Sequence, residues 1–313
     1  MYEPSSMSRT GNGRASRTVM SERTFETALA SFQSVRQINP VRPSTMAAHH
    51  EAVDRVVRVM RTKLVEPLKL QEMSRIAYVS PFHFNRMFRE ITGIPPNQFL
   101  YALRLETAKR LLLTTNTSVT DVCFDVGYNS LGTFIRRFTG LVGVSPSRFR
   151  ALGRYASTLL KETTNGLAAA TVSGPCGVSG QVLAPESFEG TIFIGLYRTP
   201  IPQGDPEAGT VVTRPGPYHI SGVRDGHYFI LAAGLTWSND PRDYFLYERA
   251  LRGGGQSILV RNGSALGCTE VTLRPPGVFD PPILVTLPLL LAGNGNGSSA
   301  LRSISNRLSK ESC

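Results

Sequence analysis

The sequence has few cysteines, a single tryptophan and no long apolar run. The four cysteines among its 313 residues lie far apart, at Cys123, Cys176, Cys268 and Cys313. They are too few for a disulfide-stabilised scaffold, and the sequence has no Cys-x-x-Cys pair to bind zinc. We therefore expect reduced thiols in a reducing compartment, with neither a bound metal nor a cofactor.

The sequence also lacks a segment that could enter or cross a membrane. The most apolar stretch, residues 283–292, has ten residues and contains Pro288, whereas a membrane-spanning helix needs about 20. The N-terminal residues are polar and lack the apolar core of a signal peptide. These features predict a cytoplasmic protein with no membrane partner.

Acidic side chains are scarce in the first half of the chain. Lys and Arg total 34 against 23 Asp and Glu, which gives a formal net charge of +11. Residues 49–155 hold sixteen basic and eight acidic side chains, whereas twelve of each follow residue 156. A basic half joined to a neutral half indicates that one region meets a polyanion and that the other has a different task.

Composition and apolar periodicity divide the chain into five stretches. Residues 1–45 are predicted to be a flexible basic tail, and helical patterning marks an all-α domain over residues 46–155. Residues 156–175 are predicted to be a linker and residues 292–313 a flexible tail. Short runs of β-forming residues, broken by Gly, Pro and Asp, predict a β-sandwich over residues 176–291. The fold class is therefore multidomain, all-α followed by all-β.

The helical half contains two short predicted helices joined by a tight turn. In residues 70–93 the first helix ends at the turn Tyr78-Val79 and the second begins after Ser80-Pro81, because Ser caps a helix and Pro suits its first position. Asn can pair with adenine and Arg with guanine in the major groove, as in a helix-turn-helix. Alone, this face could equally be a solvated surface. The outward residues that could contact DNA are Phe82, His83, Asn85, Arg86 and Arg89.

Residues 119–150 repeat this design, which favours the DNA-binding interpretation over a merely solvated face. A short helix is followed by a turn at Gly127-Tyr128, where Gly tolerates positive φ, by a cap at Asn129-Ser130 and by a second helix. The candidate DNA-contacting residues of that helix are Leu131, Gly132, Thr133, Ile135, Arg136 and Arg137.

A continuous helix is predicted between the two units, over about residues 96–114. At 1.5 Å per residue this helix spans roughly 28 Å, close to the ~34 Å of one DNA turn. Two recognition helices separated by such a spacer could enter successive major grooves on one side of a duplex.

The order and spacing of these motifs over residues 65–152 resemble a known family. SPFHFNRMFREITGIPPNQFL, RLETAKRLL and SVTDVCFDVGYNSLGTFIRRFTGLVGVSPSRFR look like the DNA-binding domain of AraC/XylS transcription regulators. The resemblance implies a seven-helix domain with tandem helix-turn-helix units and double-stranded DNA as its partner. It places base contacts at Phe82, Asn85 and Arg86 in the first unit and at Leu131, Gly132, Ile135 and Arg136 in the second.

Two departures from the family pattern affect this expectation. Tyr78 stands where the first turn usually has Gly, which could cost about 1 kcal/mol if its φ is positive. Leu131, Gly132 and Ile135 can offer only apolar contacts to thymine methyl groups. We therefore expect the first unit to discriminate sequences and the second mainly to anchor the protein through phosphate contacts.

The β half resembles the prealbumin-like fold of carboxypeptidase regulatory-like domains. The resemblance rests on GVSGQV, TIFIGLYR and YHISGVRDGHYFILAAG, in which a strand, an Asp-Gly turn and a Gly-x-Tyr strand follow one another. It implies a sandwich with an exposed sheet face or edge, suited to binding or self-association rather than catalysis. We expect it to sense a small-molecule effector, contact a protein partner or form a homodimer.

The predicted function is thus that of a sequence-specific transcription regulator, activator or repressor, and not of an enzyme. An alternative is a DNA-repair protein that uses the same helices for delivery, because similar helices occur fused to alkyl-transfer domains with an acceptor Pro-Cys-His-Arg. In this chain Gly177-Val178 follows Pro175-Cys176, so the activating histidine is absent. A second alternative is a β-domain adhesion or scaffold protein with an incidental helical bundle.

Overall fold

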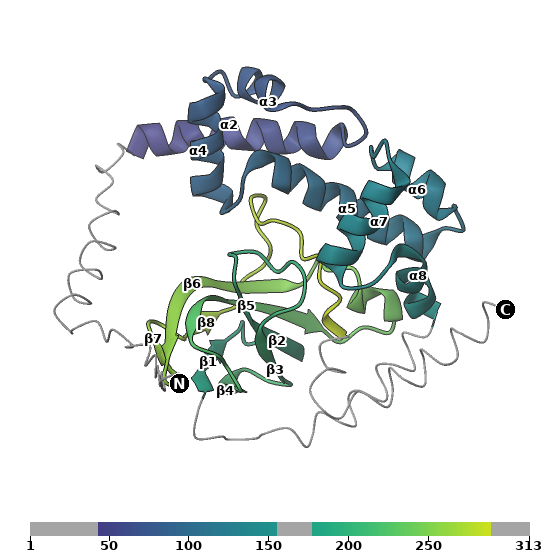
Figure 1. Cartoon of the computed structure of the whole chain (residues 1–313). Helices are drawn as coiled ribbons and strands as arrows, with labels where there is room; N and C mark the ends of the chain where they lie inside the picture. Colours follow the sequence, from purple (N-terminus) through teal and green to yellow (C-terminus); the bar gives the residue numbers. More distant parts are fainter. Residues whose placement is uncertain (1–42, 155–176, 289–313) are drawn as a thin grey trace, which may run out of the picture. The chain divides into compact units, whose positions relative to one another are not determined.

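The computed structural model describes residues 43–154 and 177–288 (Figure 1). The predicted linker and the predicted C-terminal tail lie outside these residues, as does nearly all of the predicted N-terminal tail. The described residues from 49 onward, 49–154 and 177–288, belong to one compact unit. No helix within the described ranges has the length and apolarity that crossing a membrane requires.

Residues 43–154 fold into seven helices, as expected. Serines cap several of them: the hydroxyls of Ser80, Ser118 and Ser130 each accept a backbone N–H from the first turn of the helix that follows. Gly93 and Gly143 end two helices in the left-handed conformation that glycine adopts readily. The helices are α2 (Pro43–Thr62), α3 (Leu70–Ile76), α4 (Pro81–Thr92), α5 (Pro96–Thr114), α6 (Val119–Asp125), α7 (Leu131–Val142) and α8 (Pro146–Arg154).

Two apolar cores stabilise this helical half. One core joins α2, α3, α4 and the start of α5 around Val56, Met73 and Phe88. The other joins the rest of α5 to α6, α7 and α8, with Phe134 and Phe138 at its centre. Burial of these side chains fixes each helix pair against α5, since removing apolar area from water is the main favourable term in folding.

Residues 177–288 contain a nearly closed β-sheet. The eight strands form one hydrogen-bonded sheet in the order β3-β2-β5-β6-β7-β1-β4, with β8 paired to β1. The end strands β3 and β4 lie near each other but are not paired. The strands are β1 (Gly177–Leu183), β2 (Gly190–Tyr197), β3 (Ala208–Val212), β4 (Gly216–Ser221), β5 (Gly226–Thr236), β6 (Leu251–Arg261), β7 (Ser264–Leu266) and β8 (Val271–Thr272).

This single curled sheet differs from the expected pair of stacked sheets. The sheet is continuous because β7 links β6 to β1. Strand β7 pairs with β6 over three residues and with β1 only at Gly177↔Ser264. An alternating apolar pattern shows which strand face is buried but not how the strands are joined. The sequence therefore indicated the all-β class without distinguishing a sandwich from a curled sheet.

Strand β2 is buried on both faces. Ile192 and Ile194 belong to the core inside the β domain, whereas Phe193 packs into the same cluster as α7 and α8. Residues 283–287, the run considered above for a membrane segment, supply further apolar side chains to that cluster. The outer face of the sheet and this C-terminal segment together cover the second helical core.

Lys109 of α5 is buried where this segment meets the helices. Its ammonium group donates to the carbonyl oxygens of Ile283 (3.4 Å) and Leu284 (3.3 Å) and lies 4.2 Å from the ring centroid of Tyr247. Burial lowers the pKa of Lys109 to about 7, although nearby Glu106 acts in the opposite direction. A charged lysine here therefore opposes folding near neutral pH.

We expect the free energy of unfolding to increase with pH above about 7, the pKa of Lys109 in the folded protein. Above pH 7 the unfolded chain keeps the lysine proton while the folded chain loses it, so the free energy of unfolding rises by about 1–2 kcal/mol between pH 7 and about pH 8.5. Urea unfolding at several pH values measures this change. In Lys109→Met the rise should disappear, whereas the exposed control Lys63→Met should keep it. An unchanged slope in Lys109→Met would contradict the assignment.

Candidate nucleic-acid interface

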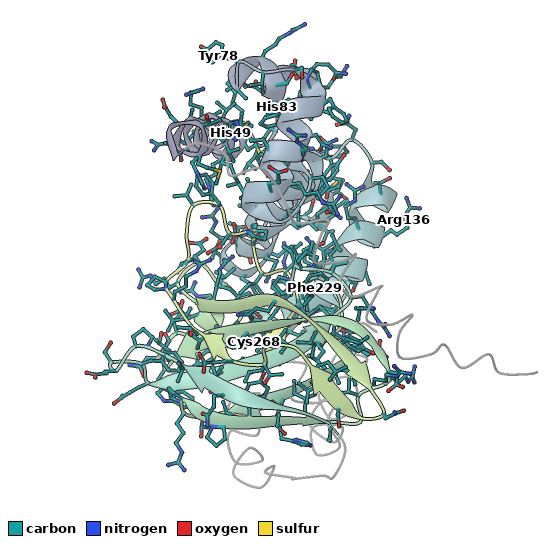
Figure 2. The ribbon with its side chains drawn as sticks, turned by 90° about the vertical axis from the view of Figure 1, so that its left-hand side faces the viewer. His49, Tyr78, His83, Arg136, Phe229 and Cys268 are labelled. Carbon is teal, nitrogen blue, oxygen red and sulfur yellow. The ribbon has the colours of Figure 1, made fainter. Side chains whose placement is uncertain are left out.

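The first candidate unit consists of α3, a tight turn and α4. At the turn Tyr78 has φ +59°, the positive value considered above, and its side chain is 83% exposed. The guanidinium carbon of Arg55 lies 5.3 Å from the centroid of the Tyr78 ring, a cation–π contact that offsets part of the backbone strain. Figure 2 shows Tyr78, His83 and His49 at the same end of the helical half.

The outer face of α4 is available to a ligand. Phe84, Met87 and Phe88 anchor the helix inward. Of the predicted contact residues on α4, His83 alone is half-buried, with its ring edge-on to His49 at a centroid distance of 5.4 Å. The exposed predicted residues of this helix are Phe82, Asn85, Arg86 and Arg89.

The second candidate unit consists of α6, a turn at Gly127 and α7. Gly127 has φ +80°, and Phe134 and Phe138 face inward as expected. Figure 2 shows Arg136 projecting outward from the ribbon. The predicted residues Gly132, Ile135 and Arg136 are exposed, whereas Leu131, Thr133 and Arg137 are half-buried.

The Arg137 side chain packs against α5 of the same chain. Its guanidinium carbon lies 3.8 Å from the ring centroid of Tyr101 on α5. The neighbouring Arg136 makes no ion pair with a described residue, so of the two arginines it is the one free to meet a phosphate. Successive helical residues point about 100° apart because the helix has about 3.6 residues per turn, which explains the difference.

A buried arginine that sequence analysis did not single out connects the loop after α2 to the turn of the second unit. Arg104 of α5 is 7% exposed and donates to three backbone carbonyls: Nε to Leu64 (2.8 Å), Nη1 to Gly127 (2.9 Å) and Nη2 to Glu66 (2.9 Å). Burial lowers the pKa of its guanidinium. The loop after α2 and the turn of the second unit are therefore tied to the same residue of the spacer helix.

Close packing at Gly127 reinforces this connection. A β-carbon there would lie 2.8 Å from the carbonyl oxygen of Leu64 and 2.9 Å from the α-carbon of Val65. Figure 1 shows α4 near the start of α5 and the α6–α7 pair toward its other end. The arrangement presents two exposed helix faces on one spacer and can place two sets of side chains against a polyanion.

The comparisons with known proteins agree with this geometry. Residues 73–152, which include both units and the spacer, match the family model of a helix-turn-helix domain. They are an AraC-type helix-turn-helix domain. A match over part of the chain identifies this domain and leaves the activity of the whole protein to be inferred.

Several transcription regulators are similar to part of the chain. The bifunctional transcriptional activator/DNA repair enzyme AdaA of Bacillus subtilis is 28% identical over 137 residues, which are 44% of this chain and 62% of that protein. The HTH-type transcriptional activator AarP of Providencia stuartii is 31% identical over 87 residues, which are 28% of this chain and 64% of that protein. The chain thus spans less than two thirds of either relative.

Among solved structures, a transcriptional regulator with an AraC-type DNA-binding domain from Chromobacterium violaceum is similar to the chain. It is 24% identical and covers 34% of this chain and 96% of its own, with a TM-score of 0.33.

Proposed function

We propose that the protein is a sequence-specific transcription regulator that binds double-stranded DNA through α4 and α7. The observation that carries this proposal is the pair of exposed helix faces joined through α5 within an AraC-type domain. AdaA and AarP are both named as transcriptional activators, which supports the same function. The basic surplus of residues 49–155 supplies attraction to phosphate.

In this proposal the two helices have different tasks. Asn85 and Arg86 of α4 hydrogen-bond base edges, Phe82 contacts thymine methyl groups and His83 or Arg89 holds a phosphate. On α7, Arg136 holds a phosphate. The remaining α7 residues, Leu131, Gly132, Thr133 and Ile135, pack against the groove, while Arg137 acts through its contact with Tyr101.

Gel-shift titration of the full chain with genomic fragments at two salt concentrations tests the function. We expect preferred fragments and a loss of affinity of at least about 100-fold between 50 and 200 mM salt, because phosphate contacts release counterions. Equal binding to every fragment, or binding insensitive to salt, would contradict a sequence-specific regulator and favour the adhesion or scaffold alternative.

Substitution of single arginines tests the division of labour. Arg86→Ala should reduce discrimination between operator variants by about 1–3 kcal/mol, since it removes a base contact. Arg136→Ala should weaken all sequences by a similar factor and lower the salt slope by about one. Arg224→Ala, a change at an exposed β-domain arginine, is the matched control. Equal losses of discrimination in the first two variants would rule out the division.

The β domain is proposed to receive the regulatory signal. Its resemblance to prealbumin-like carboxypeptidase regulatory-like domains supports a binding or self-association role. Effector sensing, contact with a protein partner and homodimer formation are each compatible with that role. A cytoplasmic location with reduced thiols is part of the same proposal.

A DNA-repair function is the second candidate, because AdaA is named as a DNA repair enzyme as well as an activator. Cys176 lies outside the described residues, and Cys268 is exposed. Incubation with methylated DNA followed by mass spectrometry separates the candidates. The regulator proposal expects no methyl group on either cysteine, whereas transfer to Cys176 or Cys268 would support repair.

A further inference from the structure

The β domain contains a cavity that the proposed DNA contacts do not use. It has a volume of about 320 Å³ and is lined by parts of β2, β3 and β5, by residues 205–207 and by Leu287. Ligand sites usually occupy about 300–1,000 Å³, so this one suits a small molecule. Phe193, Val211 and Leu231 are among the side chains that make its lining largely apolar.

The charged groups that line the cavity all have the same sign. Among the residues that the structure describes, no lysine, arginine or histidine lines it, whereas Asp205 and Glu207 do. Glu207 is already paired with Arg198 (3.5 Å) and Arg224 (3.8 Å). The carboxylate of Asp205 is exposed and forms no hydrogen bond or ion pair with a residue in the described ranges. Asp205 is therefore the charge at this site that a ligand could neutralise.

Two further groups favour a cation beside Asp205. A β-carbon at Gly143, the residue that ends α7, would lie 3.5 Å from Asp205 Oδ1, so the carboxylate sits at a helix C-terminus, where the helix dipole also attracts positive charge. Tyr197 lines the same cavity and is only 4% exposed. Burial raises the pKa of Tyr197, and Asp205 adds to the shift, so its hydroxyl stays protonated and can hydrogen-bond.

We propose that this cavity binds a small primary amine carried on an apolar or aromatic body. The ammonium group pairs with Asp205 at the end of α7, and the body of the ligand contacts the apolar lining. This inference deepens the proposed function, since it assigns a site and a ligand class to effector sensing by the β domain.

The cavity is directly connected to the second recognition helix. Gly204 donates its N–H to the carbonyl of Leu141 (3.0 Å), and Thr286 donates both its N–H (3.1 Å) and its hydroxyl (2.8 Å) to the carbonyl of Val142. Gly204 and Thr286 are chain neighbours of Asp205 and Leu287, which line the cavity. An amine that draws Asp205 toward itself therefore acts on the residues that hold the C-terminal end of α7.

Titration calorimetry of the full chain with 2-phenylethylamine and its neutral analogue 2-phenylethanol tests the site. The amine should bind at least about tenfold more tightly than the alcohol, because only the amine pairs with Asp205. Asp205→Asn should remove this advantage, whereas the matched control Glu207→Gln should keep it. Equal affinities, an amine preference that survives in Asp205→Asn, or no binding of either compound up to about 10 mM would overturn the proposal.

A gel shift with and without the amine separates this proposal from the proposed function. Operator affinity of the wild-type chain should change at least about threefold when the amine is present, and that of Asp205→Asn should not. A chain that binds the amine but no DNA would refute the regulator function and leave the site standing. A chain that binds DNA without responding to bound amine would refute the effector role.

Discussion

Replacing Arg104 by methionine is expected to lower the free energy of unfolding by about 3–5 kcal/mol, because it removes three hydrogen bonds from a buried charged donor. The carbonyl groups of Leu64, Glu66 and Gly127 would lose their shared partner. Urea unfolding followed by circular dichroism measures the loss. The exposed control Arg58→Met should change stability by less than about 1 kcal/mol.

Arg104→Lys separates the effect on stability from the effect on DNA binding. A lysine keeps the charge but has no planar fork with which to bond three carbonyls at once. If Arg104 holds the turn of the second unit against the loop after α2, the folded lysine variant should lose at least about tenfold in operator affinity and little in nonspecific affinity. Wild-type stability and operator binding in both Arg104 variants would show that the residue does not connect this loop to that turn.

Gly127 and Tyr78 occupy equivalent positions of the two turns, but substitutions there should affect stability very differently. Gly127→Ala should destabilise the protein by about 3 kcal/mol or more, because its β-carbon meets backbone atoms of Leu64 and Val65 at 2.8–2.9 Å and φ is positive. Tyr78→Gly should leave stability within about 1 kcal/mol of the wild type, since relief of strain balances the lost contact with Arg55.

Thermal and urea unfolding of both variants measure this contrast. Tyr78→Ala is the control at the first turn, because it keeps the strain and removes the contact with Arg55, and it should be the less stable of the two Tyr78 variants. Tolerance of alanine at Gly127 would show that the loop after α2 does not pack on the second turn as closely as the structure has it.

Local signals in the sequence were sufficient to predict the helical half. Ser80 and Ser130 cap the recognition helices as expected, and the suspected positive φ at Tyr78 is present. Caps and turns depend on a few neighbouring residues, so they can be recognised without tertiary information. Short runs of β-forming residues broken by Gly, Pro and Asp likewise indicated the β class of the second half.

Features that depend on distant contacts were not predictable. Arg137 was grouped with Arg136, yet it packs on Tyr101, 36 residues away in the chain. Arg104 and Lys109 looked like ordinary polar positions of a helix, although both are buried. Residues 283–287 were placed in the predicted β-sandwich as part of an apolar run too short to span a membrane, and they pack against the second helical core. Each of these outcomes depends on which surfaces meet after folding.

In the proposed complex α4 and α7 act together on one duplex, at a separation fixed by α5. Inserting about five base pairs between the two contacted segments of a mapped operator tests this arrangement most directly, because half a helical turn moves one segment to the opposite side of the DNA. We expect affinity to fall nearly to the nonspecific level after about five inserted pairs and to stay there after about ten, because α5 cannot lengthen by another turn of DNA. Unchanged affinity at every insertion length would contradict the arrangement.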